Sequence, residues 1–258
     1  MKKFIALLLA LTMIVALAAC TPTTEDPTEP SVDIHAKAEG TMTHAEYAAA
    51  ADDDAVVIEA FVQAKQGWWE QDGQGRATIY LQDNEGGYLA YNLFCTEAEF
   101  NQMTIGTKLK ITGYKTSYKG EQEIDGESAT FEILEGNWVA PATDVTSLLG
   151  ADNIINYQNM FVAIKGAKVV ASTDADGNEA AFLYNWDGSG TAGNDLYFNI
   201  EVGGVVYNMC VESYLTGDGT DVYEAVESWK VGDVVDLEGF LYWYNAAQPH
   251  ITSVVAAQ

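Results

Sequence analysis

Basic residues are scarce in this chain. Only 12 of its 258 residues are lysine or arginine, against 38 aspartates and glutamates, and the formal net charge is -26. A field of that sign repels phosphates, nucleic acid and anionic lipid headgroups. Binding of nucleic acid therefore starts at an electrostatic disadvantage.

Histidine is nearly absent, and this limits the chemistry that the chain offers. The three histidines are His35, His44 and His250. They form no recognisable pair of nucleophile and base. Carboxylates are so numerous that neighbours such as Asp52 and Asp53 are expected from composition alone, and spacing in sequence does not define a glycosidase pair. We therefore predict a protein that is not an enzyme, with no catalytic residues, no cofactor and no metal.

One acidic stretch deserves comparison with a calcium loop. Asp174, Asp176 and Asn178 in DADGNE have its opening spacing, but the glycine stands at the fourth place rather than the sixth. Asn185 occupies the twelfth place, where a bidentate glutamate is needed. The pattern favours a plain hairpin turn.

A long apolar run occurs only at the N-terminus. Lys2 and Lys3 precede an apolar segment from Phe4 to Ala19 that only Thr12 interrupts. The segment is shorter than the roughly 20 residues that span a bilayer, so a cleaved secretion signal over residues 1–19 is favoured over a permanent transmembrane anchor.

The end of that segment, Leu17-Ala18-Ala19-Cys20, resembles the lipobox of bacterial lipoproteins. The resemblance implies that Cys20 becomes the first mature residue and carries acyl chains that bind a membrane. It also implies an extracytoplasmic location, at the cell surface or on the periplasmic side. Residues 20–40 are rich in Thr, Pro and acidic residues, a composition that predicts a disordered tether.

Beyond the tether, apolar residues fall in short alternating runs typical of half-buried strands. In the first half we predict strands at 56–62, 77–81, 89–94, 109–114 and 130–134. Gly86-Gly87 is predicted to supply the positive φ angles of a tight hairpin, and Thr96–Gln102 a capped helical turn before the fourth strand. In the second half, strands are predicted at 161–170, 180–184 leading to 196–200, 205–210, 234–244 and 251–255.

Five strands with a helix between the third and fourth resemble the OB-fold, the barrel of oligonucleotide- and oligosaccharide-binding domains. The two halves also match each other. Gly106, Gly113, Tyr118 and Gln122 recur as Gly232, Gly239, Tyr244 and Gln248, always 126 residues later. We therefore predict an all-β protein with two tandem five-stranded OB-like Greek-key barrels, over residues 41–140 and 141–258. An immunoglobulin-like sandwich is the alternative.

The OB-fold resemblance implies that ligands lie across the outer faces of the second and third strands, beside the loops after the first and fourth. Period-two alternation turns Ile79 and Leu81 inward, and Thr78 and Tyr80 outward. In the second copy it turns Phe198 and Ile200 inward, and Tyr197 and Asn199 outward. The predicted ligand-binding residues are all aromatic: Trp68, Trp69, Tyr80 and Tyr118 in the first copy, and Tyr184, Trp186, Tyr197, Tyr242, Trp243 and Tyr244 in the second. Packing in the barrel is the alternative role for each.

A cluster of lysines in the first copy is the main feature that favours nucleic acid. Its members, a candidate phosphate patch, are Lys108, Lys110, Lys115 and Lys119. The second copy lacks them, and lysines that protect a strand edge explain the cluster equally well. We predict a non-catalytic binding or adaptor module for an oligosaccharide or a protein, with an oligonucleotide as the alternative ligand.

With Cys20 acylated, Cys95 and Cys210 remain. They stand at equivalent places at the end of a third strand, which favours two buried thiols. A disulfide between them requires Cα atoms within about 7 Å.

Overall fold

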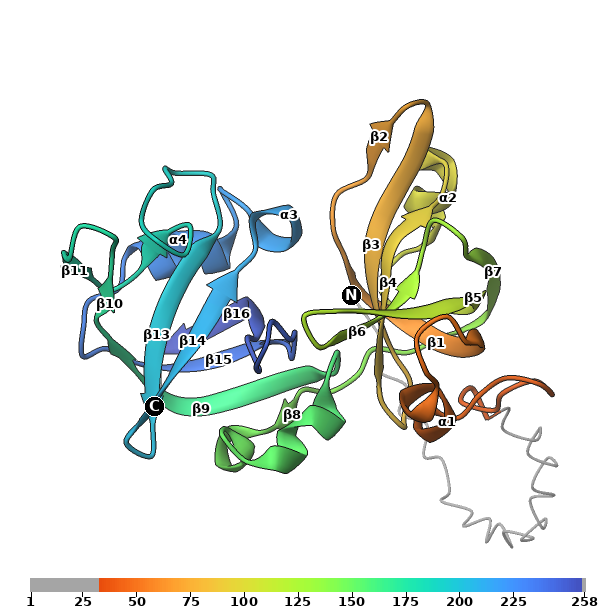
Figure 1. Cartoon of the computed structure of the whole chain (residues 1–258), viewed down its shortest axis with the longest axis horizontal. Coiled ribbons are helices and arrows are strands. Elements are labelled where there is room, and N and C mark those ends of the chain that lie inside the picture. The colour runs from red at the N-terminus through yellow and green to blue at the C-terminus, as the bar shows by residue number, and fades with distance from the viewer. Residues whose placement is uncertain (1–32, 257–258) are drawn as a thin grey trace, which may run out of the picture. The chain divides into compact units, whose positions relative to one another are not determined.

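The computed structural model describes residues 33–256, which form two seven-stranded β-sheets and one two-stranded hairpin (Figure 1). The predicted signal peptide, Cys20 and the tether up to residue 32 lie outside the described residues. No helix within the described range is long and apolar enough to cross a membrane.

The first sheet closes into a five-stranded barrel. Strands β1, β3, β4, β6 and β5 follow one another around it, and β5 pairs with β1 to complete the ring. The β4–β6 pairing is parallel and the other pairings of the ring are antiparallel. The inward side chains, among them Ile58, Ile79 and Ile111, form one buried cluster. The strands are β1 (Ala55–Lys65), β2 (Trp69–Gln71), β3 (Gln74–Gln82), β4 (Gly87–Phe94), β5 (Thr107–Tyr118), β6 (Glu121–Asp125) and β7 (Thr130–Asn137).

The second sheet repeats this arrangement. Strands β9, β13, β14, β16 and β15 follow one another, with β15 paired back to β9 and a parallel β14–β16 pairing. A separate buried cluster around Phe198, Met209 and Leu237 fills it. The strands are β8 (Thr143–Asp144), β9 (Phe161–Val170), β10 (Ser172–Thr173), β11 (Glu179–Ala180), β12 (Leu183–Tyr184), β13 (Leu196–Val202), β14 (Val205–Val211), β15 (Val234–Phe240) and β16 (His250–Ala256).

In both barrels a helix lies where an OB-like order places it, between the third and fourth barrel strands, while α1 precedes β1. In the first barrel α2 has a capping box in which Thr96 and Glu99 satisfy each other's backbone N–H groups. The second barrel has two helices at this position. The helices are α1 (His44–Ala49), α2 (Glu97–Gln102), α3 (Ser213–Thr216) and α4 (Asp221–Glu227), with 3-10 turns η1 (Thr146–Leu148) and η2 (Asp152–Tyr157). The prediction of two tandem OB-like barrels is confirmed.

The matched glycines occupy matched backbone positions. Gly106 and Gly232 both have positive φ angles, 89° and 101°, and their N–H groups donate to the carbonyls of Val62 and Val169. Within the following strand, a Cβ on Gly239 would lie 2.1 Å from the His250 carbonyl oxygen, and one on Gly113 would lie 2.8 Å from Ala129 Cβ. Only glycine permits these close approaches.

The predicted role of Gly86-Gly87 is wrong in its mechanism. These two residues join β3 to β4, but neither has a positive φ angle. They are needed for space: a Cβ on Gly86 would lie 2.3 Å from the His44 ring, and one on Gly87 would lie 2.2 Å from the backbone of Asn159. The counterpart hairpin does use positive φ angles, 62° at Gly203 and 84° at Gly204.

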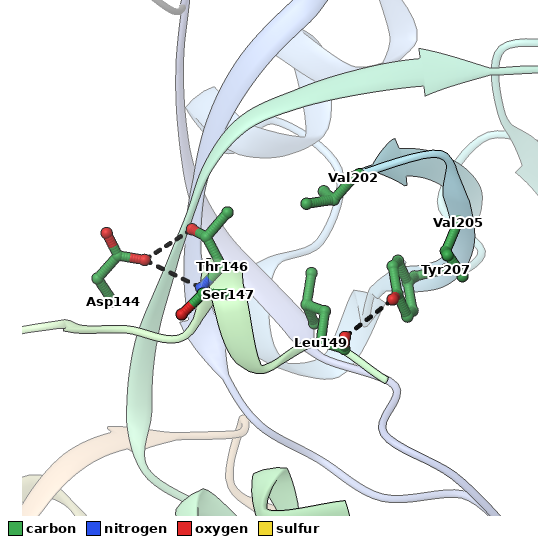
Figure 2. A pocket seen from close by; sticks show the side chains of 8 residues that line it. Asp144, Thr146, Ser147, Leu149, Val202, Val205 and Tyr207 are labelled. Carbon is green, nitrogen blue, oxygen red and sulfur yellow. Dashed lines mark hydrogen bonds between the residues drawn. The ribbon is translucent and has the colours of Figure 1, made fainter. Parts of the chain in front are cut away.

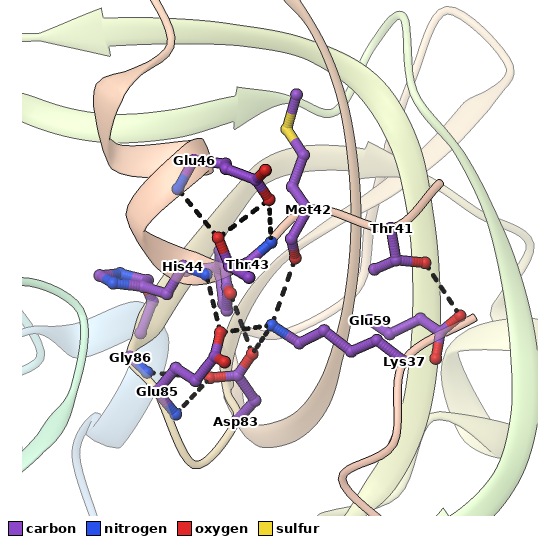
Figure 3. A network of polar contacts seen from close by, with 12 residues as sticks. Lys37, Thr41, Met42, Thr43, His44, Glu46, Glu59, Asp83, Glu85 and Gly86 are labelled. Atoms are coloured by element: carbon purple, nitrogen blue, oxygen red, sulfur yellow. Dashed lines mark hydrogen bonds and ion pairs between the residues drawn. The ribbon is translucent and has the colours of Figure 1, made fainter. Parts of the chain in front are cut away.

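The end of the predicted tether packs on the first barrel. Lys37 Nζ lies 2.8 Å from carboxylate oxygens of both Asp83 and Glu85 (Figure 3), and the Ala38 N–H donates to Glu59 (3.3 Å). Thr41, just after the predicted tether, also donates to Glu59 (3.2 Å). Lys108 donates to the carbonyl of Ala36. The prediction of disorder up to residue 40 therefore does not hold for these last residues, because their polar groups find partners on β1 and the β3–β4 turn.

Cys95 and Cys210 are both buried and free. Burial raises the pKa of the Cys95 thiol to about 11. The interpretation of two buried thiols is confirmed.

The Asp174 stretch is a turn, as predicted. The Asp174 carboxylate accepts from the N–H groups of Asp176 and Asn178 within the β10–β11 hairpin.

Candidate ligand-binding site

The outer face of β3 is covered by the second barrel. Tyr80, Leu89 and Phe240 form a small cluster between the barrels, with the Tyr80 and Phe240 rings 4.6 Å apart. The Tyr80 hydroxyl lies 3.0 Å from His250 Nδ1, and only 1% of Tyr80 is exposed. Alternation correctly turned Tyr80 away from its own barrel core, but the prediction that it binds ligand is wrong because another domain occupies that face.

Two equivalent hairpins meet at the same interface. The loop between β5 and β6 touches the segment after β15: Asn245 N–H donates to the Lys119 carbonyl (2.7 Å), and the Trp243 ring lies over Gly120. The backbone N–H of Trp243 donates to the Glu121 carboxylate (2.7 Å). Trp243 also packs on the second core. It therefore holds the barrels together rather than presenting a free ring to a ligand.

Two carboxyl groups of β6 are buried at this interface. Burial raises the pKa of Glu121 to about 8 and, helped by the charge of Asp125, that of Glu123 to about 7. β6 was missed in the sequence because EQEID contains one strongly apolar residue, Ile124. Glu121 accepts from the backbone N–H of Trp243 in the second barrel, so its shifted pKa accompanies docking of the barrels.

The predicted phosphate patch does not form. Lys108 is buried and pairs with the buried Glu59 at 3.1 Å. Lys115 is also buried, and its ammonium donates to the carbonyls of Tyr47, Ala48 and Ala50 at the end of α1. Desolvation lowers the Lys115 pKa. Both lysines stabilise the first barrel, which leaves only Lys110 and Lys119 of the four in contact with solvent.

The second barrel has an open aromatic hollow at the place that the OB-fold resemblance implies. It has a volume of about 400 Å³ and is lined by Trp186, Tyr197, Tyr244 and Gln248. We call these four residues the aromatic hollow. Trp186 comes from the loop before β13 and is 72% exposed, Tyr197 projects from β13, and Tyr244 follows β15. Three predicted ligand-binding residues are thus brought together, and no charged side chain lines the hollow.

A row of amide side chains continues from the aromatic hollow across the sheet. Gln248 Nε2 donates to Asn208 Oδ1 (2.7 Å), and Asn208 Nδ2 donates to Asn199 Oδ1 (3.0 Å). Asn199 and Asn208 face each other on β13 and β14. Amides both donate and accept, as hydroxyl groups do. The predicted Tyr184 takes no part, because its hydroxyl donates to Glu227 (2.6 Å) and its ring packs on the core.

A second aromatic surface lies between the barrels. A groove of about 620 Å³ is lined by Trp68, Trp69, Tyr91, Tyr214, Gln66 and Glu212, together with Gly67 and Asn92. We call this the inter-barrel groove. Trp68 is fixed by its indole N–H, which donates to the Cys95 carbonyl, and the Arg76 guanidinium lies over the Trp69 ring. The sequence indicated the two tryptophans. It gave no sign of Tyr214, which follows β14 with no repeated counterpart.

No protein-family model and no curated protein sequence matches the chain. Solved structures do. A murine DNA-binding protein bound to double-stranded DNA has a TM-score of 0.38 at 13% identity, covering 79% of this chain and all of the other. The p204 HINb domain has a TM-score of 0.36 at 10% identity, covering 80% and 100%. A replication protein A heterotrimer bound to single-stranded DNA has a TM-score of 0.33 at 11% identity, covering 74% and 45%. Such similarity concerns the fold alone, and no ligand is inferred from it.

Another hollow, of about 600 Å³, lies between η1 and the β13–β14 turn (Figure 2). Several of its polar groups are engaged within the chain: Asp144 accepts from Thr146, and the Tyr207 hydroxyl donates to the Leu149 carbonyl (2.9 Å). Its other side chains include Val202 and Val205. It presents one aromatic ring to a ligand, whereas the aromatic hollow presents three.

Among the described residues, no three His, Cys, Asp or Glu side chains are grouped as a metal site needs.

Proposed function

We propose that this protein is a membrane-anchored, extracytoplasmic lipoprotein that binds a neutral oligosaccharide through the aromatic hollow of its second barrel, without catalysis. The observation that carries the proposal is the convergence of Trp186, Tyr197 and Tyr244 with Gln248 in one open, uncharged hollow.

The chemistry of the hollow matches that of a sugar. A sugar ring has apolar C–H faces, which pack on flat aromatic rings, and a rim of hydroxyl groups. The row of Gln248, Asn208 and Asn199 offers amide donors and acceptors beside those rings. Because the lining carries no charge, a neutral ligand is bound without leaving an unpaired buried charge.

An oligonucleotide is the alternative ligand. Bases also stack on aromatic rings, but phosphates need cations. The linings of the aromatic hollow and the inter-barrel groove include no lysine or arginine, and Arg76, which lies over the Trp69 ring, is already paired with Glu127. The burial of Lys108 and Lys115 removes half of the patch that favoured nucleic acid. A protein ligand would use the same exposed rings as anchors.

A binding screen tests this proposal. The protein is applied to an array of neutral glycans, acidic glycans and single-stranded oligonucleotides, in parallel with Trp186→Ala and Tyr197→Ala. We expect binding to neutral glycans that each substitution weakens by at least about tenfold, the usual cost of removing an anchoring aromatic. Tyr114→Ala is the matched control, since Tyr114 is 49% exposed and lines neither surface. Binding confined to oligonucleotides, and strengthened at low salt, would support the alternative.

The anchor is tested separately. Cys20→Ala is expected to abolish incorporation of labelled fatty acid and to release the protein from the membrane fraction, while leaving glycan binding unchanged. Retention of Cys20→Ala in the membrane would contradict a lipid anchor and favour a transmembrane segment.

A further inference from the structure

The inter-barrel groove exists only because the two barrels are docked. Gln66 of the first barrel donates from Nε2 to both carboxylate oxygens of Glu212 in the second (2.9 and 2.8 Å). Beside it, the Gly67 N–H donates to the Tyr214 carbonyl (3.2 Å). Trp68, Trp69 and Tyr91 come from the first barrel and Tyr214 from the second. The groove is therefore a composite surface that neither barrel has alone.

Glu212 is the only charged residue in the groove lining, and it already has partners. Its carboxylate lies 3.6 Å from His250 Nδ1, in addition to the contact with Gln66. Burial would raise its pKa, but the contacts with His250 and Gln66 hold the pKa below its ordinary value. A ligand in the groove therefore meets an ionised, hydrogen-bonded carboxylate among aromatic rings, which accepts hydrogen bonds from hydroxyl groups and repels an anion.

Aromatic side chains lie beside both the groove and the aromatic hollow. Tyr244 of the hollow contacts Tyr118, with ring centroids 6.2 Å apart. Tyr242, two residues before Tyr244, stacks on His250 at 4.1 Å, and His250 is the neighbour of Glu212 in the groove. Burial is the main cause that raises the pKa of Tyr242, and the negative charges of Glu121, Glu123 and Glu212 add to it.

A second connection runs through the sheet. Tyr197 of the hollow pairs with Cys210, two residues before Glu212 of the groove. The β13–β14 pair and the segment from Tyr242 to Tyr244 therefore each carry or adjoin residues of both the hollow and the groove. The side chains that would receive a ligand are exposed: 72% of Trp186, 40% of Trp69 and 76% of Tyr214.

We propose that the aromatic hollow and the inter-barrel groove are two subsites of one binding track, and that the ligand is a linear, neutral oligosaccharide long enough to occupy both. This inference rests on the proposed function and adds the length of the ligand and the docking of the barrels as determinants of affinity. Once one end of an oligosaccharide occupies the first subsite, binding of its other end to the second subsite is intramolecular. Affinity therefore rises with the length of the oligosaccharide.

Isothermal titration with ladders of oligosaccharides tests the inference. The probes are β-linked glucose, β-linked mannose and α-linked glucose oligomers, each from disaccharide to hexasaccharide. For the ladder that binds, we expect the hexasaccharide to bind at least about tenfold more tightly than the disaccharide. Trp69→Ala and Tyr214→Ala should remove this gain and leave disaccharide affinity unchanged. Trp186→Ala should weaken every length, and Tyr114→Ala none.

The outcomes distinguish a failure of the proposed function from a failure of the two-subsite track alone. If no ladder binds, or if Trp186→Ala leaves disaccharide binding intact, the proposed function is overturned and this inference with it. If the disaccharide binds in the hollow but affinity does not rise with length, or if the rise survives both Trp69→Ala and Tyr214→Ala, only the two-subsite track is overturned. Because Trp69 and Tyr214 are exposed, unchanged melting temperatures of their variants will show that the fold is intact.

Discussion

Tyr118 and Tyr244 occupy equivalent positions in the two halves of the chain, and their rings contact each other with centroids 6.2 Å apart. The duplicated hairpins thus pack together instead of flanking two independent sites. One consequence is a division of roles between similar barrels. The outer face of β3 in the first barrel is used for docking, and the corresponding face of the second barrel is open to ligand.

Glu121 makes stability depend on pH. Its folded-state pKa of about 8 lies above the ordinary value of 4.5. The stability that protonated Glu121 contributes is therefore complete below about pH 4.5 and is lost as the pH rises through about 8. At pH 7, burial of this carboxyl group lowers the free energy of unfolding by on the order of 3 kcal/mol relative to a glutamate with an ordinary pKa.

We expect Glu121→Gln to flatten this dependence and to raise the free energy of unfolding at pH 7 relative to the wild type. Urea denaturation at several pH values between about 4.5 and 8 measures it. Glu135→Gln is the control, since Glu135 is exposed on β7. Parallel pH profiles for wild type and Glu121→Gln would contradict the burial of a protonated carboxyl at the interface.

Lys115 is predicted to be structural. Lys115→Met removes three hydrogen bonds to the carbonyls that end α1. We expect a loss of about 2–3 kcal/mol in the free energy of unfolding, because buried carbonyls lose a charged donor. Lys119→Met, at an exposed position, should change stability by less than about 0.5 kcal/mol. If denaturation experiments show equal, small changes in the free energy of unfolding for Lys115→Met and Lys119→Met, Lys115 is not a buried structural residue.

Gly87 is predicted to control docking of the barrels. A side chain there would meet the backbone of Asn159 and Met160 at 2.2 and 2.4 Å. We expect Gly87→Ala to lower the free energy of unfolding by about 1–3 kcal/mol, as overpacking does. Gly67→Ala, where a Cβ meets nothing within 4 Å, is the matched control. If thermal unfolding of Gly87→Ala matches that of Gly67→Ala, the close contact between barrels is not as described.

Tyr80 and Tyr197 show which features of the candidate site can be predicted from the sequence and which cannot. Alternation of apolar and polar residues predicted both the strands and the side of the sheet from which each tyrosine projects, because the period of two is set by the backbone. It could not predict what covers that side. Tyr80 is buried under Phe240, whereas Tyr197 lines the aromatic hollow. Docking of one domain on another depends on contacts between distant residues that have no local pattern.

The sequence around Glu59 contains a partial signal for a buried ion pair. Glu59 is the only charged residue within the apolar run of β1, and the ladder places Lys108 opposite Phe61, two residues away. A lone carboxylate in a buried strand needs a cationic partner. That rule predicts a buried cation beside Glu59, but only the register of the β1–β5 pair identifies it as Lys108. Lys115 gave no such signal, because its partners are backbone carbonyls.

Assigned indole N–H signals in a nitrogen–proton correlation spectrum test the central claim most directly. The chain has six tryptophans, and Trp138 and Trp229 are internal controls because they pack against Phe61 and Phe198. Adding a neutral disaccharide from the ladder that binds is predicted to shift the Trp186 signal alone, and the hexasaccharide to shift the Trp69 signal as well. A titration in which Trp186 stays fixed while the protein binds the sugar elsewhere would contradict the account.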